Sequence, residues 1–221
     1  MMDTISIADP LFQRYPELAT ARDSINALAR LMLSTALSGG TIFTCGNGGS
    51  AADADHIAGE LIKGFLLPRP LGEDLRNLMA SAVESGAIAP EAAERLSLKL
   101  QTPVRALSLG SNHALLTAIL NDQGQDLIFA QQLLGLCEPG DLLICLSTSG
   151  RSPNVLAVAA LAKVLGAQVA ALTGPDPCSL DEYCTVVIHT PGNDAGQIQD
   201  LHRPVYHALC AFVEKSLFGR T

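Results

Sequence analysis

The sequence predicts an α/β fold, a three-layer α/β/α sandwich with a central parallel sheet of about five strands. Short apolar segments rich in β-branched residues alternate along the chain with longer segments of helical periodicity. A glycine-rich turn and a serine-rich turn each follow an apolar segment and open a helix. Strands that alternate with helices at this spacing pair in parallel, and helices then cover both faces of the sheet.

The expected elements follow one another without a linker, a repeat or a low-complexity segment, so we expect a single domain over residues 1–221. Pro16 is expected to break the first helix, and Pro204 either kinks the last helix or marks its start. The predicted strands span residues 41–45, 104–109, 141–146, 168–172 and 185–189. The predicted helices span residues 11–37, 51 onward, 75–85, 90–100, 115–120, 127–136, 153–165 and 198–217.

The composition limits the classes of function. A chain of 221 residues can bury a sizeable core, and 48% of its residues are apolar while only 16% are charged. So few charges indicate that apolar helix faces are buried between subunits. The formal net charge of −8 argues against nucleic acid or an anionic membrane as the main partner.

The sequence also bears on location. It begins without a basic segment followed by an apolar one, and no apolar run reaches about 18 residues without a charge, so neither a signal peptide nor a transmembrane helix is expected. Buried thiols in a reducing cytoplasm are the expected state of the cysteines, and we expect a cytoplasmic protein. The cysteines are scattered without a C-x-x-C pair, at Cys45, Cys137, Cys145, Cys178, Cys184 and Cys210.

The stretch 41–60, TIFTCGNGGSAADADHIAGE, combines a short strand, a glycine turn and the start of a helix. Gly48 and Gly49 allow the backbone to turn sharply and to approach a ligand. Ser50 is the expected helix N-cap and Asp53 the expected capping-box acid. Free N–H groups and the helix dipole converge at such a turn, which is typical of a phosphate site.

A second turn of this kind, LSTSGRSPNV, follows the apolar segment 141–145 and opens another helix. Two such turns in one domain arise by chance much less often than one. Hydroxyl and backbone N–H groups at helix starts bind phosphate without a basic side chain. The candidate residues for phosphate and sugar binding in the two turns are Asn47, Gly48, Gly49, Ser50, Ser147, Thr148, Ser149 and Ser152.

The motifs CGNGGSAADADH, LSTSGRSPNV and IQDLHRPVYHALC together resemble the SIS (sugar isomerase) domain family, and within it the sedoheptulose-7-phosphate (phosphoheptose) isomerases. The resemblance covers nearly the whole chain and implies a flavodoxin-like SIS domain. It also implies a homotetramer with active sites at subunit interfaces, in which His207 would approach His56 and Glu60 of another subunit. The segment at about 66–103 departs from the family as a helical insertion, either a hairpin at the surface or in a subunit contact, or a lid over the sugar.

The resemblance also implies the catalytic residues. Glu60 and His207 match the family's catalytic base and acid by position in their motifs, and a carboxylate and a histidine suit proton transfer between C1 and C2 of a sugar. His56, which shares a helix face with Glu60, completes with Gln199 the four positions that bind zinc in some members, so zinc is the expected cofactor. Gln199 and Asn112 match positions near the substrate. We expect structural roles for the remaining candidates, His202 and His189.

Three departures from the family pattern leave the identity of the sugar open. The family usually has aspartate where Asn112 stands, glycine then arginine where residues 63–64 stand, and asparagine where Arg151 stands. The leading hypothesis is an isomerase that converts sedoheptulose 7-phosphate to D-glycero-D-manno-heptose 7-phosphate. The alternatives are an isomerase of a different ketose phosphate and a non-catalytic SIS module that binds a phosphosugar or a protein. Non-catalytic relatives lack the equivalents of Glu60 and His207.

Overall fold

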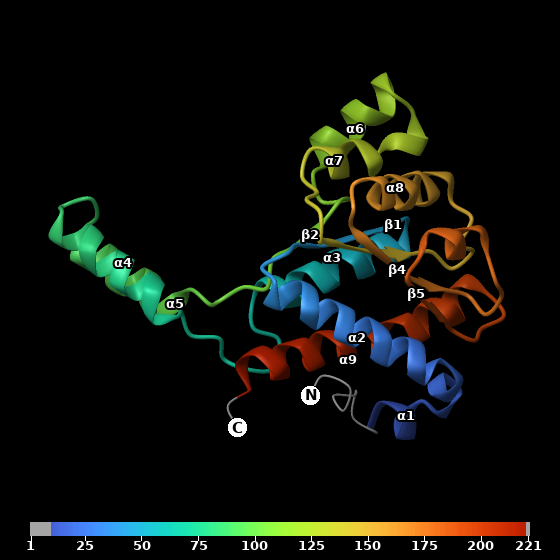
Figure 1. The fold of residues 1–221 in the computed structure, drawn as a ribbon, viewed down its shortest axis with the longest axis horizontal. Coiled ribbons are helices and arrows are strands. Elements are labelled where there is room, and N and C mark those ends of the chain that lie inside the picture. Colours follow the sequence, from blue (N-terminus) through green and yellow to red (C-terminus); the bar gives the residue numbers. More distant parts are fainter. Residues whose placement is uncertain (1–9, 220–221) are drawn as a thin grey trace.

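Residues 10–219 are described in a computed structural model, and within them a five-stranded parallel sheet lies between two layers of helices (Figure 1). This arrangement confirms the predicted fold class. The order across the sheet is β2-β1-β3-β4-β5, and every neighbouring pair is parallel. The strands are β1 (Ile42–Gly46), β2 (Ala106–Ser108), β3 (Leu142–Leu146), β4 (Gln168–Thr173) and β5 (Val186–His189). The start of the chain, on which the expectation about a signal peptide rests, lies outside the described residues.

Both faces of the sheet are buried because side chains alternate along each strand. In β3, Leu142 and Ile144 join the cluster on one face, and Leu143 and Cys145 join the cluster on the other. The first face is covered by α1 (Pro10–Arg14), η1 (Pro16–Ala21), α2 (Arg22–Leu37), α3 (Gly49–Ile62) and α9 (Ala195–Phe218). The second is covered by α6 (His113–Asp122), η2 (Gln125–Leu127), α7 (Ala130–Leu134), α8 (Pro153–Val164) and η3 (Ser179–Tyr183).

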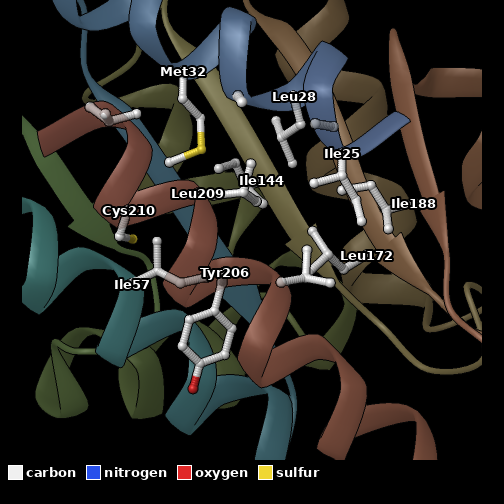
Figure 2. Close-up of a cluster of buried hydrophobic side chains, with 14 of the residues drawn as sticks. Ile25, Leu28, Met32, Ile57, Ile144, Leu172, Ile188, Tyr206, Leu209 and Cys210 are labelled. Carbon is white, nitrogen blue, oxygen red and sulfur yellow. The ribbon is translucent and has the colours of Figure 1, made fainter. Parts of the chain in front are cut away.

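Helices α2 and α9 pack against the sheet through a continuous apolar cluster (Figure 2). Ile25 and Leu28 of α2 belong to this cluster together with Leu172 of β4, and none of the three is exposed. The ring of Tyr206 in α9 belongs to the same cluster, while its hydroxyl points away from it (Figure 2). Because α9 is held on this core, its polar residues keep a fixed position relative to α3.

The predicted strands and helices are found, with boundaries that shift by a few residues. Pro16 separates α1 from η1, as expected, and Pro204 lies inside the continuous helix α9 rather than at its start. The helix predicted over residues 127–136 is present but shorter than expected. Gly124, with a φ of 108°, turns the chain into the 3-10 turn η2, and the α-helical part is confined to α7.

The segment after α3 forms a helical hairpin, α4 (Glu73–Glu84) and α5 (Pro90–Lys99), which projects away from the sheet and its helix layers (Figure 1). The two helices pack against each other. Within the described chain, the hairpin buries only Ala93. Its large apolar side chains that remain exposed are Leu75, Leu78, Leu96 and Leu98.

The expectation that the cysteines are buried thiols holds for three of the six, while Cys137, Cys178 and Cys184 are partly exposed. All six thiols are free, and Cys45, Cys145 and Cys210 are buried. Over residues 10–219, no helix combines the length and the apolar character that crossing a membrane would need.

Candidate active site

The glycine turn after β1 adopts the conformation that glycine allows. Gly48 has a φ of 56°, in the left-handed region, and α3 begins directly after it at Gly49. The predicted N-cap at Ser50 and the capping box with Asp53 are therefore wrong, because the chain enters the helix earlier than expected. Ser50 lies buried in the first turn, where its N–H donates to the carbonyl of Asn47 at 3.0 Å.

Helix α9 approaches this turn closely through Gln199. The Gln199 amide donates from Nε2 to Ser50 Oγ at 3.3 Å. A Cβ atom at Gly49 would lie 2.8 Å from Gln199 Oε1, so only glycine fits there without a shift. The expected substrate residues Gly49, Ser50 and Gln199 thus meet at one point.

The serine turn after β3 is held by its own hydroxyl groups. Gly150 N–H donates to Ser147 Oγ at 3.2 Å, and Ser147 Oγ lies 3.5 Å from Ser152 Oγ. Arg151 N–H donates to Ser149 Oγ at 3.3 Å, and the carbonyl of Thr148 accepts the N–H of Gly174 at 3.0 Å. Ser152 immediately precedes α8 and occupies its N-cap position. The hydroxyls predicted to bind phosphate therefore surround a helix start.

The two turns lie side by side because β1 and β3 are neighbours, with Gly46 opposite Leu146 at their carboxyl ends. Asn47 and Asn154 link them through two reciprocal amide hydrogen bonds of 2.9 Å. A hollow of about 240 Å³ is lined by Asn47, Ser152, Asn154, Gln125, Asp126 and Pro153. Asn154 is a further candidate that the sequence did not predict, although its place in the first turn of α8 was a signal.

His56, Glu60 and His207 meet between α3 and α9. His56 Nε2 lies 2.9 Å from Glu60 Oε1, and His207 Nε2 lies 3.4 Å from the same oxygen. One ligand atom from each residue falls within 4.8 Å of the others. The expectation that His207 would approach His56 and Glu60 of another subunit is wrong, because the three meet within one chain. Parallel packing of α3 on α9 places them there.

Glu60 is buried, whereas His56 is exposed and His207 is partly exposed. Among residues 10–219, Glu60 Oε2 and His207 Nε2 find no hydrogen-bond partner although both atoms are buried. The 3.4 Å approach of His207 to Glu60 is thus an ion-pair distance without hydrogen-bond alignment. Burial lowers the pKa of His207. The charge of Glu60 acts to raise this pKa and His56 acts to lower it, and the net shift is downward. The pKa of the neighbouring Cys210 thiol is raised well above its ordinary value, mainly by burial.

Tyr206 and Asp53 lie on the Nδ1 side of the His56 ring. The Tyr206 hydroxyl donates to Asp53 Oδ1 at 3.0 Å and lies 3.5 Å from His56 Nδ1. Burial raises the pKa of Tyr206, as does the Asp53 charge, so the hydroxyl keeps its proton. This pair fixes the side of His56 opposite Glu60. Tyr206 was not predicted from the sequence, where its only signal was its place beside His207.

The side chains of His56, Glu60 and His207 are of the chemical types that bind zinc. Histidine nitrogens and a carboxylate oxygen are ordinary zinc ligands, and the unpartnered atoms of Glu60 and His207 are buried polar atoms that an ion would satisfy. Gln199 lies eight residues before His207, about 12 Å along the axis of α9, and its amide contacts Ser50. The structure therefore brings three of the four expected ligands together and places Gln199 at the glycine turn.

The remaining candidates have structural contacts. Asn112 is the N-cap of α6 and accepts the N–H of Leu115 at 3.1 Å. Buried His202 donates from Nε2 to the carbonyl of Thr173 at 3.1 Å, and His189 Nδ1 contacts the same residue's hydroxyl at 3.0 Å. The structural roles expected for both histidines agree with these contacts.

Gly64 occupies the position at which the resemblance would place arginine. A side chain there would collide with Gln101 Oε1, which accepts the Gly64 N–H at 2.6 Å, and would lie 2.7 Å from the carbonyl of Leu67. Gln101 belongs to the segment that returns from the hairpin. The departure at Gly64 is therefore coupled to the path of the chain around α4 and α5.

The sheet order and the paired turns define a doubly wound α/β domain of the type that binds phosphorylated ligands at the carboxyl edge of its strands. A family model of the SIS domain matches residues 13–102 and 80–174. The chain belongs to the SIS domain family.

Phosphoheptose isomerases are among the relatives of this chain. A phosphoheptose isomerase from Akkermansia muciniphila is 33% identical over 215 residues, covering 97% of this chain and 95% of the relative. One from Rhodospirillum rubrum is 34% identical over 200 residues, covering 90% and 89%. The solved phosphoheptose isomerase from Francisella tularensis superposes with a TM-score of 0.72 at 26% identity, covering 92% of each chain. The one from Neisseria gonorrhoeae gives 0.68 at 28% identity, covering 92% and 96%.

Proposed function

We propose that this protein is an aldose–ketose isomerase that converts sedoheptulose 7-phosphate to D-glycero-D-manno-heptose 7-phosphate. The observation that carries the proposal is that His207 of α9 meets Glu60, which lies on the helix that the glycine turn opens, within one chain. The full-length relatives named phosphoheptose isomerase support the substrate. The two turns supply hydroxyl and N–H donors for the phosphate in a chain whose net charge is −8.

Glu60 is the base of the proposed reaction. Its Oε1 atom is engaged by His56, whereas Oε2 has no partner in the described chain and is available to accept the C1 or C2 proton. His207 is the proton donor to the carbonyl oxygen of the sugar. Its lowered pKa keeps the imidazole neutral at pH 7, and a neutral imidazole carries an N–H that it can donate.

A zinc ion would be held by His56, Glu60 and His207. Gln199, the fourth ligand that the resemblance implies, contacts Ser50 instead. Zinc, when bound, supplies a Lewis acid that polarises a carbonyl oxygen. Tyr206 orients His56 from the side away from Glu60. Along α3, Ser50 lies near the beginning of the helix and Glu60 near its end. The phosphate of the sugar would therefore bind near Ser50 and the reacting carbons near Glu60.

Two competing functions have different support. A non-catalytic module is disfavoured because Glu60 and His207 are both present and adjacent. A different ketose phosphate is favoured by Gly64, where the packing of Gln101 excludes the arginine of the family pattern, and by Asn112, which caps α6. The preferred length of the sugar separates these possibilities.

The proposal includes a cytoplasmic homotetramer with active sites at subunit interfaces. Support comes from large apolar side chains that one chain leaves exposed, among them Leu78, Leu98 and Val164. The hairpin of α4 and α5 carries several of them. A stable, active monomer in sedimentation would contradict the assembly.

The deciding experiment is a coupled assay of the purified protein across ketose phosphates of five to seven carbons. We expect the highest kcat/KM for sedoheptulose 7-phosphate, with an aldose phosphate as the product. Preference for a shorter sugar would replace the substrate but keep the reaction class. Phosphosugar binding without turnover on any member of the panel would establish the non-catalytic module.

A further inference from the structure

Arg69 is a buried charged residue outside the group of His56, Glu60 and His207. It lies in the segment between α3 and the hairpin, where two prolines indicate a loop, yet only 1% of its surface is exposed. Its partner Glu214, in α9, is equally buried. Arg69 Nε donates to Glu214 Oε1 at 2.7 Å. A buried ion pair is costly to desolvate, so its contacts need an explanation.

Glu214 accepts three backbone hydrogen bonds from the segment that follows α3. Its Oε1 atom accepts the N–H of Phe65 at 2.8 Å, and its Oε2 atom accepts those of Leu66 at 2.7 Å and Leu67 at 3.0 Å. Burial by itself would raise the pKa of Glu214, but these N–H groups and the Arg69 charge outweigh it and lower the pKa. The carboxylate therefore stays charged and binds the chain immediately beyond α3.

Arg69 reaches the end of α3 with its other two nitrogens. Nη2 donates to the backbone carbonyl of Glu60 at 2.9 Å, and Nη1 donates to that of Leu61 at 2.7 Å. The last carbonyls of a helix lack partners within the helix, and a cation there also complements the helix dipole. The guanidinium thus fixes the backbone of the residue that carries the proposed base.

The other end of this arrangement lies on the helix of the proposed acid. Glu214 follows His207 by seven residues, two helical turns, so both side chains project from the same side of α9. The chain of contacts runs from His207 along α9 to Glu214, through Arg69, and back to the carbonyl of Glu60. These contacts therefore connect α3 and α9 a second time, close to the 3.4 Å contact between Glu60 and His207.

We infer that Arg69 and Glu214 are positioning residues for the isomerase, holding the end of α3 so that the Glu60 carboxylate stays in register with His207. This inference rests on the proposed function. Neither residue belongs to the two turns that would bind the phosphate. Loss of the pair should therefore lower kcat and leave KM for the sugar phosphate nearly unchanged.

The test is Arg69→Lys. Lysine keeps the charge, but one ammonium group cannot serve Glu214 and two carbonyls in the fork geometry of arginine. Because small displacements of a catalytic group are costly, kcat should fall by about tenfold or more, while KM changes by less than about twofold. Hydrogen exchange should quicken over residues 58–67 and stay unchanged over residues 142–153. Arg105→Lys is the matched control, since Arg105 also donates to a backbone carbonyl, that of Gly39, but at an exposed site.

The outcomes are distinguishable. Unchanged kcat and exchange in Arg69→Lys would overturn the inference, as would a kcat loss that disappears after normalisation to the folded fraction. If this variant does not fold, the double variant Arg69→Met/Glu214→Gln replaces it, because removing both charges leaves neither buried alone. If the wild type does not turn over sedoheptulose 7-phosphate, the proposed function fails, and the exchange measurement still decides whether Arg69 holds the end of α3.

Discussion

The Nε2 atom of His207 lies 3.4 Å from the Oε1 atom of Glu60 within a single chain, although the two residues belong to α9 and α3. The helices run in the same direction, since Ser50 meets Gln199 near their beginnings and the chain just beyond α3 meets Glu214 near the end of α9. A single chain therefore brings the proposed base and the proposed acid together. Assembly can add contacts to this pair but is not needed to bring it together.

Glu60→Gln tests the proposed base. The amide keeps the size of the side chain and its hydrogen-bonding atoms but cannot take a proton, so kcat should fall by about 10²- to 10⁴-fold. The affinity for the sugar phosphate should survive, because the proposed phosphate site lies in the two turns and not at Glu60. Turnover and ligand binding are measured on the same preparation. His207→Asn should behave similarly, and near-wild-type turnover in both variants would remove these residues from the mechanism.

Ser147→Ala tests the serine turn. A hydrogen bond to a charged phosphate contributes about 1.5–3 kcal/mol, so KM should rise by roughly 10- to 100-fold, with kcat little changed. Steady-state kinetics with the preferred ketose phosphate measures both constants. Ser97→Ala in the hairpin is the control, because that hydroxyl contacts Met79 far from the turns. A fall in kcat alone would place Ser147 at the reacting end instead.

Metal removal tests the zinc site. Dialysis against a chelator should lower activity, and added zinc should restore it. His56→Ala should weaken zinc binding by about tenfold or more, since it removes one ligand and the contact that Tyr206 makes behind it. Zinc content after gel filtration is measured alongside activity, with exposed His113→Ala as the control. Equal zinc affinity in wild type and His56→Ala would exclude this ligand set.

His202 predicts how stability depends on pH. Burial lowers its pKa in the folded state, because the Nδ1 atom has no partner within the described residues and its protonation would bury an unsatisfied donor. The stabilisation that comes from holding His202 neutral is complete above the unfolded pKa of about 6.5. It is lost as the pH falls from there through the folded pKa. Thermal melts of wild type and His202→Gln between pH 8 and pH 5 check this. The variant keeps a donor for Thr173 without titrating, so its melting point should depend less on pH. Parallel curves would contradict the assignment.

Local patterns in the sequence were enough to predict the sheet and both turns. Apolar strands such as 141–146 are buried on both faces, so their hydrophobic character is unambiguous. The N-cap at Ser50 could not be predicted, because the φ of Gly48 decides where α3 begins. The contact of Glu60 with His207 in one chain depends on how α3 packs on α9, which no local pattern encodes. Arg69 was missed for the same reason, since its partner is distant in sequence.

The hairpin of α4 and α5 has a further consequence for the evolution of the chain. The segments that lead into and out of the hairpin are joined by two hydrogen bonds. Thr102 N–H donates to the carbonyl of Arg69 at 2.8 Å, and Thr102 Oγ1 donates to that of Pro70 at 2.9 Å. A loop whose ends are already joined gains or loses residues at little entropic cost. Residues could therefore be added or removed between Leu71 and Gln101 without a change in how α3 packs on the sheet.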